Sequence, residues 1–286
     1  MRKGLAEVAD RVVGRAPAGG VALGIGMTVL AVFLFGLMDT IGKYLMRSHP
    51  FPQVVWARYF FQCTLMLVML PRLGITGFLR TRRHGLQIGR GLLLLLATLC
   101  MYAAIRVVPL ADAYAITFAA PLLVTALSVP LLNERVGWRR WSAVLVGFAG
   151  VLIVIRPGFG QVPWQLLLPL VTAPCFALYQ IFTRLISVDP CETPFVMLFY
   201  LAWVGALAMT LIVPFYWRPV TPVEWLWMAA IGALGAAGHL ILIQALRVAP
   251  VSLIAPFTYS QIIWALILGY LVFGDLPDAW TLAGCT

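Results

Sequence analysis

Charged side chains are scarce in this sequence, which has ten acidic and twenty basic residues among 286. Soluble domains are about a quarter charged, whereas 10% of this chain is charged and 62% is hydrophobic. A water-soluble fold has too little interior for so many apolar side chains. The net charge of +10 lies mostly in loops between apolar runs, where it orients a chain against lipid headgroups. We therefore expect membrane lipids around the protein and no nucleic acid partner.

Motifs of catalysis are missing as well. The sequence has no H-E-x-x-H, G-x-S-x-G, Walker A or dinucleotide-binding glycine pattern, so it predicts no enzyme, no cofactor and no ATP hydrolysis. The five cysteines follow no metal-ligand spacing, and no metal site is expected. An intramembrane enzyme would need paired carboxylates or a His-Asp cluster at one interface, and the acidic residues are too scattered for that. A channel is the other rival, and it would show conductance that does not saturate.

The N-terminus lacks the features of a secretory signal. Residues 1–18 are polar and basic, and the apolar run that follows is about twice the length of a signal core. The sequence therefore predicts a cytoplasmic arm over residues 1–20, followed directly by a first membrane span.

Apolar segments long enough to cross a bilayer fill the rest of the chain, since a spanning helix needs about 20 mostly apolar residues. A tenth segment begins near Ala279, and the sequence stops at Thr286. The fold class expected is an all-α integral membrane protein with ten spans, the last incomplete in this chain. The nine earlier spans are expected near residues 21–46, 51–70, 87–107, 110–132, 140–155, 164–186, 194–216, 223–246 and 249–273.

Basic residues between the spans predict the orientation, because cytoplasmic loops carry an excess of Lys and Arg. With the N-terminus in the cytoplasm, fourteen basic residues fall inside and five outside, and Arg58 falls within a span. The basic connection 72–90 contributes most of this bias. The expected location is a bacterial inner membrane, crossed many times, with the N-terminus in the cytoplasm.

The sequence repeats itself when it is shifted by 141 residues. Because five spans is an odd number, a second copy must enter the membrane upside down. Such an inverted repeat is common in secondary transporters, where two opposed halves form a site near the bilayer midplane. We expect one five-helix repeat over 21–160 and an inverted one over 161–286. The matching pairs are Lys43 with Arg184, Gly91 with Gly232, 106–109 with 247–250, Thr117 with Thr258, and Glu134 with Asp275.

These residues resemble the EamA-type branch of the drug/metabolite transporter superfamily. The likeness rests on the R-x-x-P links 106–109 and 247–250, on the acidic residues Glu134 and Asp275 that follow the fourth helices, and on the stretch from Met38. It implies two five-helix repeats and a small-molecule substrate, which in this family ranges over amino acids, vitamins, drugs and sugar phosphates. It also implies that the fifth and tenth helices lie away from the cavity, at the contact of a homodimer. In the second half Gly274 replaces Asn133 of the first.

The reading that this resemblance favours is a secondary transporter that exports amino acids or related metabolites by alternating access. The alternative within the class is another carrier of the same superfamily, with a drug, vitamin, sugar-phosphate or nucleotide-sugar substrate. A sugar-phosphate exchanger should place several basic residues mid-span in both halves, and this chain offers few.

Polar residues inside the spans are the candidates for the substrate cavity, since buried charge in a membrane is costly and tends to mark function. Asp39 and Lys43 lie four apart and share a helix face, either lining a cavity or forming a local ion pair. Arg58 either pairs with Asp39 or reaches the outer headgroups. Pro121 and Pro256 kink their spans and are candidate gate hinges. The full set of cavity candidates is Asp39, Lys43, Tyr102, Tyr114, Tyr179, His239, Gln244 and Tyr259.

Overall fold

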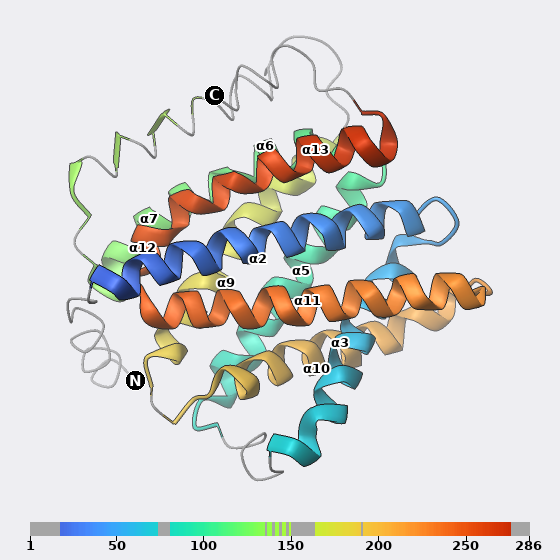
Figure 1. The fold of residues 1–286 in the computed structure, drawn as a ribbon, viewed down its shortest axis with the longest axis horizontal. Helices are drawn as coiled ribbons and strands as arrows, with labels where there is room; N and C mark the ends of the chain where they lie inside the picture. Colours follow the sequence, from blue (N-terminus) through green and yellow to red (C-terminus); the bar gives the residue numbers. More distant parts are fainter. Residues whose placement is uncertain are drawn as a thin grey trace.

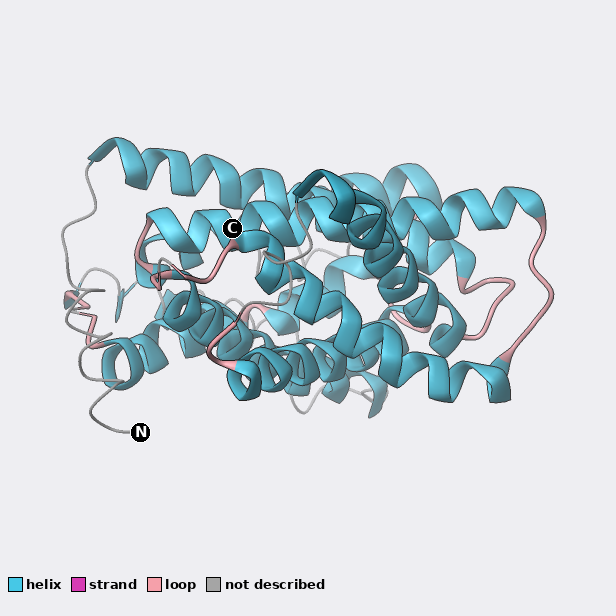
Figure 2. Cartoon of the chain, turned by 90° about the horizontal axis from the view of Figure 1, so that it is seen from below, coloured by secondary structure: helices cyan, strands magenta, loops and turns pink. Residues whose placement is uncertain are grey.

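A computed structural model describes residues 18–73, 81–134, 164–189 and 191–275, with a few separate residues between 136 and 149. Every regular element in these ranges is a helix, as the composition predicts (Figures 1 and 2). The expected fifth span at 140–155 lies mostly outside the described residues, and the expected N-terminal arm and tenth span lie outside them almost completely. Eight of the ten expected spans can therefore be followed.

The helices of the first half are α2 (Ala18–Leu45), α3 (Phe51–Leu73), α5 (His84–Ile105), α6 (Leu110–Thr117) and α7 (Ala119–Leu132). Those of the second half are η1 (Trp164–Leu167), α9 (Leu168–Ser187), α10 (Pro194–Ile212), η2 (Val213–Tyr216), α11 (Pro222–Val248), α12 (Val251–Ile254), η3 (Ala255–Ser260) and α13 (Gln261–Phe273).

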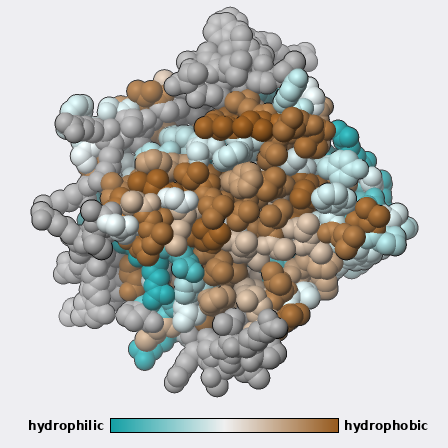
Figure 3. Space-filling model, viewed as in Figure 1, coloured by the Kyte–Doolittle hydropathy of each residue, from teal (hydrophilic) through white to brown (hydrophobic). Residues whose placement is uncertain are grey.

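Seven helical segments of the described chain are long and apolar enough to cross a membrane. Large apolar side chains such as Leu211 and Phe215 remain exposed on them, and Figure 3 shows apolar side chains over the middle of one face and hydrophilic ones toward its right-hand edge. Helix α3 is not among the seven, because Gln53, Arg58 and Gln62 lower its hydropathy. All three are buried, so α3 turns its polar side inward. The chain is a multi-pass membrane protein.

The fourth and ninth spans are interrupted at matching places. The fourth breaks between α6 and α7 at Phe118, and the ninth runs through the 3-10 segment η3 at 255–260. Proline has no N–H to bond the carbonyl four residues earlier, so Pro121 removes the bond to Thr117 where α6 ends. Pro256 likewise falls within η3. The predicted kinks are present, and their use as hinges stays a prediction.

The two halves run in opposite directions through the bundle. Lys43, at the end of the first span, contacts Asp275, just beyond the end of the ninth. Arg184, near the end of the sixth span, contacts the carbonyl of Leu246 near the end of the eighth, and the chain enters the ninth span five residues later. Equivalent first helices of the halves, α2 and α9, therefore end at opposite ends of the bundle. The described spans confirm the inverted repeat.

Helix α11 packs closely on α2 and α3, beside which it lies in Figure 1. A Cβ atom added to Gly232 would lie 2.4 Å from Cβ of Phe61, and one added to Gly238 would lie 2.6 Å from the Phe35 ring. Small residues let helix backbones approach each other in membranes. These glycines therefore hold the second half against the first, directly around the cavity described next.

Candidate functional site

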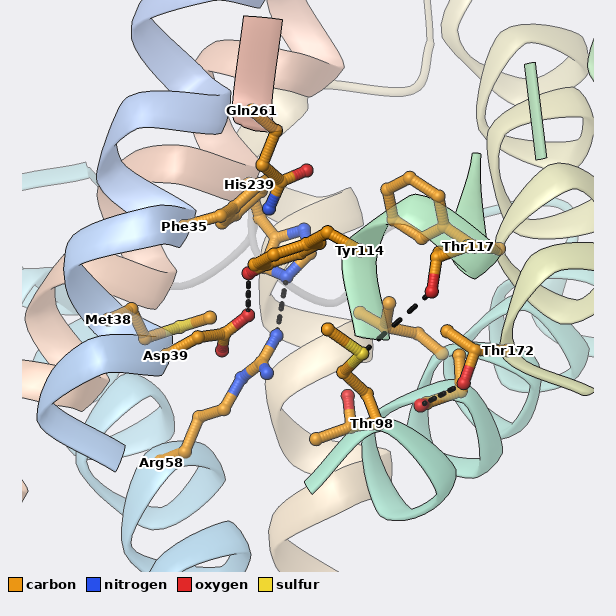
Figure 4. Close-up of a pocket in the computed structure, with 14 residues that line it drawn as sticks. Phe35, Met38, Asp39, Arg58, Thr98, Tyr114, Thr117, Thr172, His239 and Gln261 are labelled. Atoms are coloured by element: carbon orange, nitrogen blue, oxygen red, sulfur yellow. Dashed lines mark hydrogen bonds between the residues drawn. The ribbon is translucent and has the colours of Figure 1, made fainter. Parts of the chain in front are cut away.

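A cavity lies between the two halves and is partly open to its surroundings. The space not filled by atoms there, including its open part, is about 490 Å3. Helices from both halves line it, and Figure 4 shows its polar groups converging from several of them. The lining residues are Phe35, Met38, Asp39, Arg58, Leu94, Ala97, Thr98, Met101, Tyr114, Thr117, Thr172, Phe176, His239 and Gln261.

Asp39 of α2 and Arg58 of α3 bring opposite charges to this cavity, and both are about 95% buried. They do not bond to each other. Tyr114 donates its hydroxyl proton to Asp39, and Nη2 of Arg58 lies 3.1 Å from Nε2 of His239 (Figure 4). In the described part of the chain, Oδ1 of Asp39 and Nε of Arg58 have no hydrogen-bond partner. A carboxylate and a guanidinium thus face one cavity, and the buried Tyr102 hydroxyl lies beside both of them.

His239 of α11 connects the cavity to a deeper layer of polar residues. Its Nδ1 lies 3.1 Å from the hydroxyl oxygen of Tyr179, which is fully buried behind the cavity wall. Since Arg58 can only donate, Nε2 of His239 accepts and Nδ1 carries the proton. Tyr179 then accepts from His239, and the guanidinium of Arg90 lies over its ring at 5.6 Å. These contacts with Tyr179 and Arg90 fix the orientation of the imidazole and, through it, that of the Arg58 side chain.

The expected cavity residues divide into three groups in the structure. Asp39, Tyr114 and His239 line the cavity. Tyr102 and Tyr179 are fully buried and lie behind the lining.

Lys43, Gln244 and Tyr259 lie elsewhere, which differs from the expectation. Nζ of Lys43 donates to Asp275 and to the carbonyl of Val108, so it forms no ion pair with Asp39. Gln244 is exposed on the outer side of α11. Tyr259 donates to the carbonyl of Phe118 at the break of the fourth span. The physical reason for Lys43 is that it lies about 6 Å further along α2 than Asp39, where the Asp275 carboxylate and the Val108 carbonyl are within reach of its Nζ.

Several lining residues were not among the expected ones, and the repeat offset would have found Thr98 from the expected residue His239. Thr98 lies 141 positions before His239, and Phe176 lies 141 positions after Phe35. Both members of each pair line the cavity. An apolar residue such as Phe176 carries no signal of its own within an apolar span, and only its position relative to the repeat distinguishes it.

One polar cluster joins the halves at the end of the bundle where the first span ends. Nζ of Lys43 lies 3.0 Å from Asp275 and 3.1 Å from the carbonyl oxygen of Val108. Its members are partly exposed, with 15% of the Lys43 side chain and 32% of the Asp275 side chain accessible.

The opposite end has an equivalent cluster that is more deeply buried. Nη1 of Arg184 donates to the carbonyls of Leu246 and Arg247 at 2.6 and 3.0 Å. The Glu134 carboxylate accepts from the backbone N–H groups of Val251 and Ser252, both at 3.1 Å. Lys43 matches Arg184, and Asp275 matches Glu134, under the 141-residue offset. Each end is therefore closed by an acidic residue from the half that does not supply the basic one.

Comparison with known proteins gives one consistent assignment. The model of the EamA-like transporter family matches residues 22–156 and again residues 163–286. The chain is 31% identical to the S-adenosylmethionine uptake transporter of Rickettsia bellii, over 92% of this chain and 89% of that protein. It is 28% identical to the riboflavin transporter of Vibrio cholerae, over 85% and 82% of the two chains.

Two further comparisons agree with these matches. The pseudopaline exporter of Pseudomonas aeruginosa is 26% identical, with 91% of both chains covered. A solved structure titled only as a crystal structure of a protein shares the fold, with a TM-score of 0.70 at 18% identity over 94% of this chain and 93% of the other.

Proposed function

Because the chain belongs to the EamA-like transporter family, whose secondary transporters move small molecules, we propose that it carries zwitterionic, amino-acid-type metabolites by alternating access. The observation that carries the substrate class is the pair Asp39 and Arg58. These opposite charges are buried on neighbouring helices, line one cavity and bond to other residues rather than to each other.

A zwitterion matches this arrangement in charge. The Asp39 carboxylate attracts an ammonium or sulfonium group, and the planar Arg58 guanidinium can bind a carboxylate through two parallel hydrogen bonds. Low dielectric strengthens both interactions. A charged side chain deep in a membrane costs about 2.5–3.5 kcal/mol on insertion scales, so a binding role accounts for keeping two of them here. Two relatives named for S-adenosylmethionine and pseudopaline transport support a search among amino-acid derivatives.

The two end clusters support alternating access. The cavity lies between halves that are joined at one end through Lys43 and Asp275. At the other end they are joined through Glu134, which accepts from the backbone of Val251 and Ser252. Parting the contacts at one end while the other stays closed would expose the cavity to one side of the membrane. Glu134 is more deeply buried than Lys43 and Asp275. We therefore propose that the contacts at the Glu134 end separate less easily than those at the other end. We propose a bacterial inner membrane as the location and a cytoplasmic N-terminus.

Counterflow in proteoliposomes tests the function. Vesicles loaded with an unlabelled compound should accumulate the same labelled compound only if the wild-type protein is present. The panel holds neutral amino acids, S-adenosylmethionine, riboflavin, and a sugar phosphate as an anionic control. Saturable counterflow of a zwitterion that Asp39→Asn lowers about tenfold or more is the expected result. Riboflavin or sugar-phosphate counterflow without any zwitterion flux would replace the proposed substrate class, and no flux of any solute would reject the carrier function.

The direction of transport is a separate question. The sequence predicts export. Among the relatives, one is named as an uptake transporter, one as an exporter, and the riboflavin transporter's name gives no direction. Everted and right-side-out membrane vesicles, given the same outward gradient of labelled substrate, measure it directly.

A further inference from the structure

Aromatic rings form a continuous arc along one side of the cavity. The Phe35 and His239 ring centroids are 4.7 Å apart, those of His239 and Tyr179 are 5.7 Å apart, and those of Tyr179 and Phe176 are 5.6 Å apart at an interplanar angle of 25°. Phe35, His239 and Phe176 line the cavity itself, while Tyr179 supports the arc from behind.

The two ends of the arc are the same residue type at the same place in the two halves. Phe35 on α2 and Phe176 on α9 are 141 positions apart, which is the repeat offset. In an inverted repeat, residues that coincide under this offset lie on opposite sides of the axis between the halves. A group bound on that axis therefore meets a phenyl ring from each half.

The arc is held in place by its surroundings. The Phe35 ring fills the space above Gly238, where an added Cβ would come within 2.6 Å of it. His239 is fixed between Arg58 and Tyr179 by hydrogen bonds of 3.1 Å each. Rings that are already ordered lose little freedom on binding a ligand. Most other lining side chains on α2 and α5 are apolar, and two of them are methionines that adapt to a ligand's shape.

The arc adjoins the charged pair. Phe35 precedes Asp39 by one helical turn on α2, so the two side chains share a face. His239, inside the arc, bonds to Arg58. A ligand whose charged head lies at Asp39 and Arg58 would extend its body along Phe35 and toward Phe176, which lines the same cavity.

We propose that this arc seats a flat, conjugated ring, so that the substrate is a zwitterion that carries an aromatic or heteroaromatic group. This inference rests on the proposed function and narrows it. Aromatic faces prefer offset or edge contacts with another ring, and the three rings of the arc that line the cavity offer several of them. An aliphatic amino acid would fill the charged site and leave the arc unused.

Two amino acids with the same head and nearly the same size test the inference. Phenylalanine has a planar ring, and β-cyclohexylalanine has its saturated, puckered counterpart. Competition against a labelled zwitterion is measured for both with the purified wild-type protein in nanodiscs. We expect phenylalanine to bind about 3- to 10-fold more tightly, the range that one or two ring contacts provide. A second pair, tryptophan and leucine, should show a larger difference in the same direction.

A substitution then assigns the difference to the arc. Phe176 is only half-buried, so Phe176→Leu should fold, which size-exclusion chromatography and thermal unfolding check. Its ratio of phenylalanine to cyclohexylalanine affinity should fall toward one, whereas Phe176→Tyr should keep a ratio near that of the wild type.

The outcomes separate the two proposals. Equal affinity for both members of each pair in the wild type overturns the ring inference and leaves a zwitterion carrier intact. A wild-type ratio that survives Phe176→Leu also overturns it, because the preference then comes from elsewhere. Binding of no zwitterion at all overturns the proposed function, and with it this inference.

Discussion

Nζ of Lys43 lies 3.0 Å from a carboxylate oxygen of Asp275, a residue 232 positions further along the chain and in the other half of the molecule. The pair joins the halves at one end of the bundle, and at the other end Glu134 joins them by accepting from the backbone of Val251 and Ser252, near Leu246, to whose carbonyl Arg184 donates. The two ends differ in burial. Glu134 and Arg184 are buried, while Lys43 and Asp275 are partly exposed, and this difference leads to the first prediction.

Replacing the acidic residue should cost more stability at the buried end. Glu134→Ala leaves the N–H groups of Val251 and Ser252 without their acceptor, at about 1–3 kcal/mol for each buried group left unsatisfied. Asp275→Ala breaks a partly exposed ion pair, which is worth about 1 kcal/mol or less. Thermal unfolding of both variants in the same detergent should therefore show a larger loss for Glu134→Ala. An equal loss of unfolding temperature in the two variants, or a larger loss for Asp275→Ala, would contradict the proposal that the contacts at the Glu134 end are the stronger ones.

Locking either end should stop transport if both ends must part in turn. Cysteines at positions 43 and 275, in a background with the native cysteines replaced, are joined by a short bifunctional thiol reagent. We expect counterflow to fall to the level of empty vesicles after cross-linking and to recover when a cleavable linker is reduced. Each single-cysteine variant, treated in the same way, is the matched control. Full transport in the cross-linked protein would show that this end does not open.

Close packing of α11 predicts a difference between two glycines. A Cβ added at Gly232 would lie 2.4 Å from the Phe61 side chain and 2.9 Å from the backbone nitrogen of Gln62, which cannot move aside easily. A Cβ added at Gly26 of α2 meets nothing within 4 Å. Gly232→Ala should thus lower the unfolding temperature by separating α11 from α3. Gly26→Ala should leave it unchanged or raise it slightly, because alanine favours helix by about 1 kcal/mol. Equal unfolding temperatures for the two variants would contradict the close packing of α11 at Gly232.

Much of the fold could be predicted from the sequence because membranes restrict the choice of structure. Backbone groups in lipid must be bonded internally, so long apolar runs specify helices, and the offset of 141 residues specifies the inverted arrangement. The structure also explains why Gly274 stands in the second half where the first half has Asn133. Asn133 and Gly274 both end their helices in the left-handed region, at φ of 52° and 72°, a conformation that asparagine tolerates and glycine adopts freely.

The site was less predictable from the sequence. A polar residue within a span indicates that it has some polar contact, but it does not indicate which residue it contacts. Asp39 and His239 were identified because a charge or an imidazole in a span is unusual. Lys43 looked the same by that criterion, yet its partner is Asp275, which follows a distant helix. Phe176 gave no signal, because aromatic residues are ordinary in apolar helices and its role depends on the shape of the cavity. Pairing between distant helices is a property of packing, which helical periodicity does not encode.

Helix α11 carries a matched pair that tests the site directly. His239 is 1% exposed and bonds both to Arg58 and to Tyr179, whereas Gln244 lies five residues later on the exposed side. His239→Ala removes the acceptor that orients Arg58, so the guanidinium loses its alignment with a bound carboxylate. We expect transport at subsaturating substrate to fall by about tenfold or more, the effect of roughly 1.4 kcal/mol.

Gln244→Ala, at an exposed position that does not line the cavity, should stay within about twofold of the wild type. Initial rates of counterflow, corrected for the amount of protein in the vesicles, measure both variants. His239→Gln provides an intermediate case, because its amide oxygen can accept from Arg58 without reproducing the bond to Tyr179. Its rate should lie between those of His239→Ala and the wild type. If His239→Ala transports as fast as Gln244→Ala, the imidazole is a packing residue and the cavity does not use the orientation of Arg58.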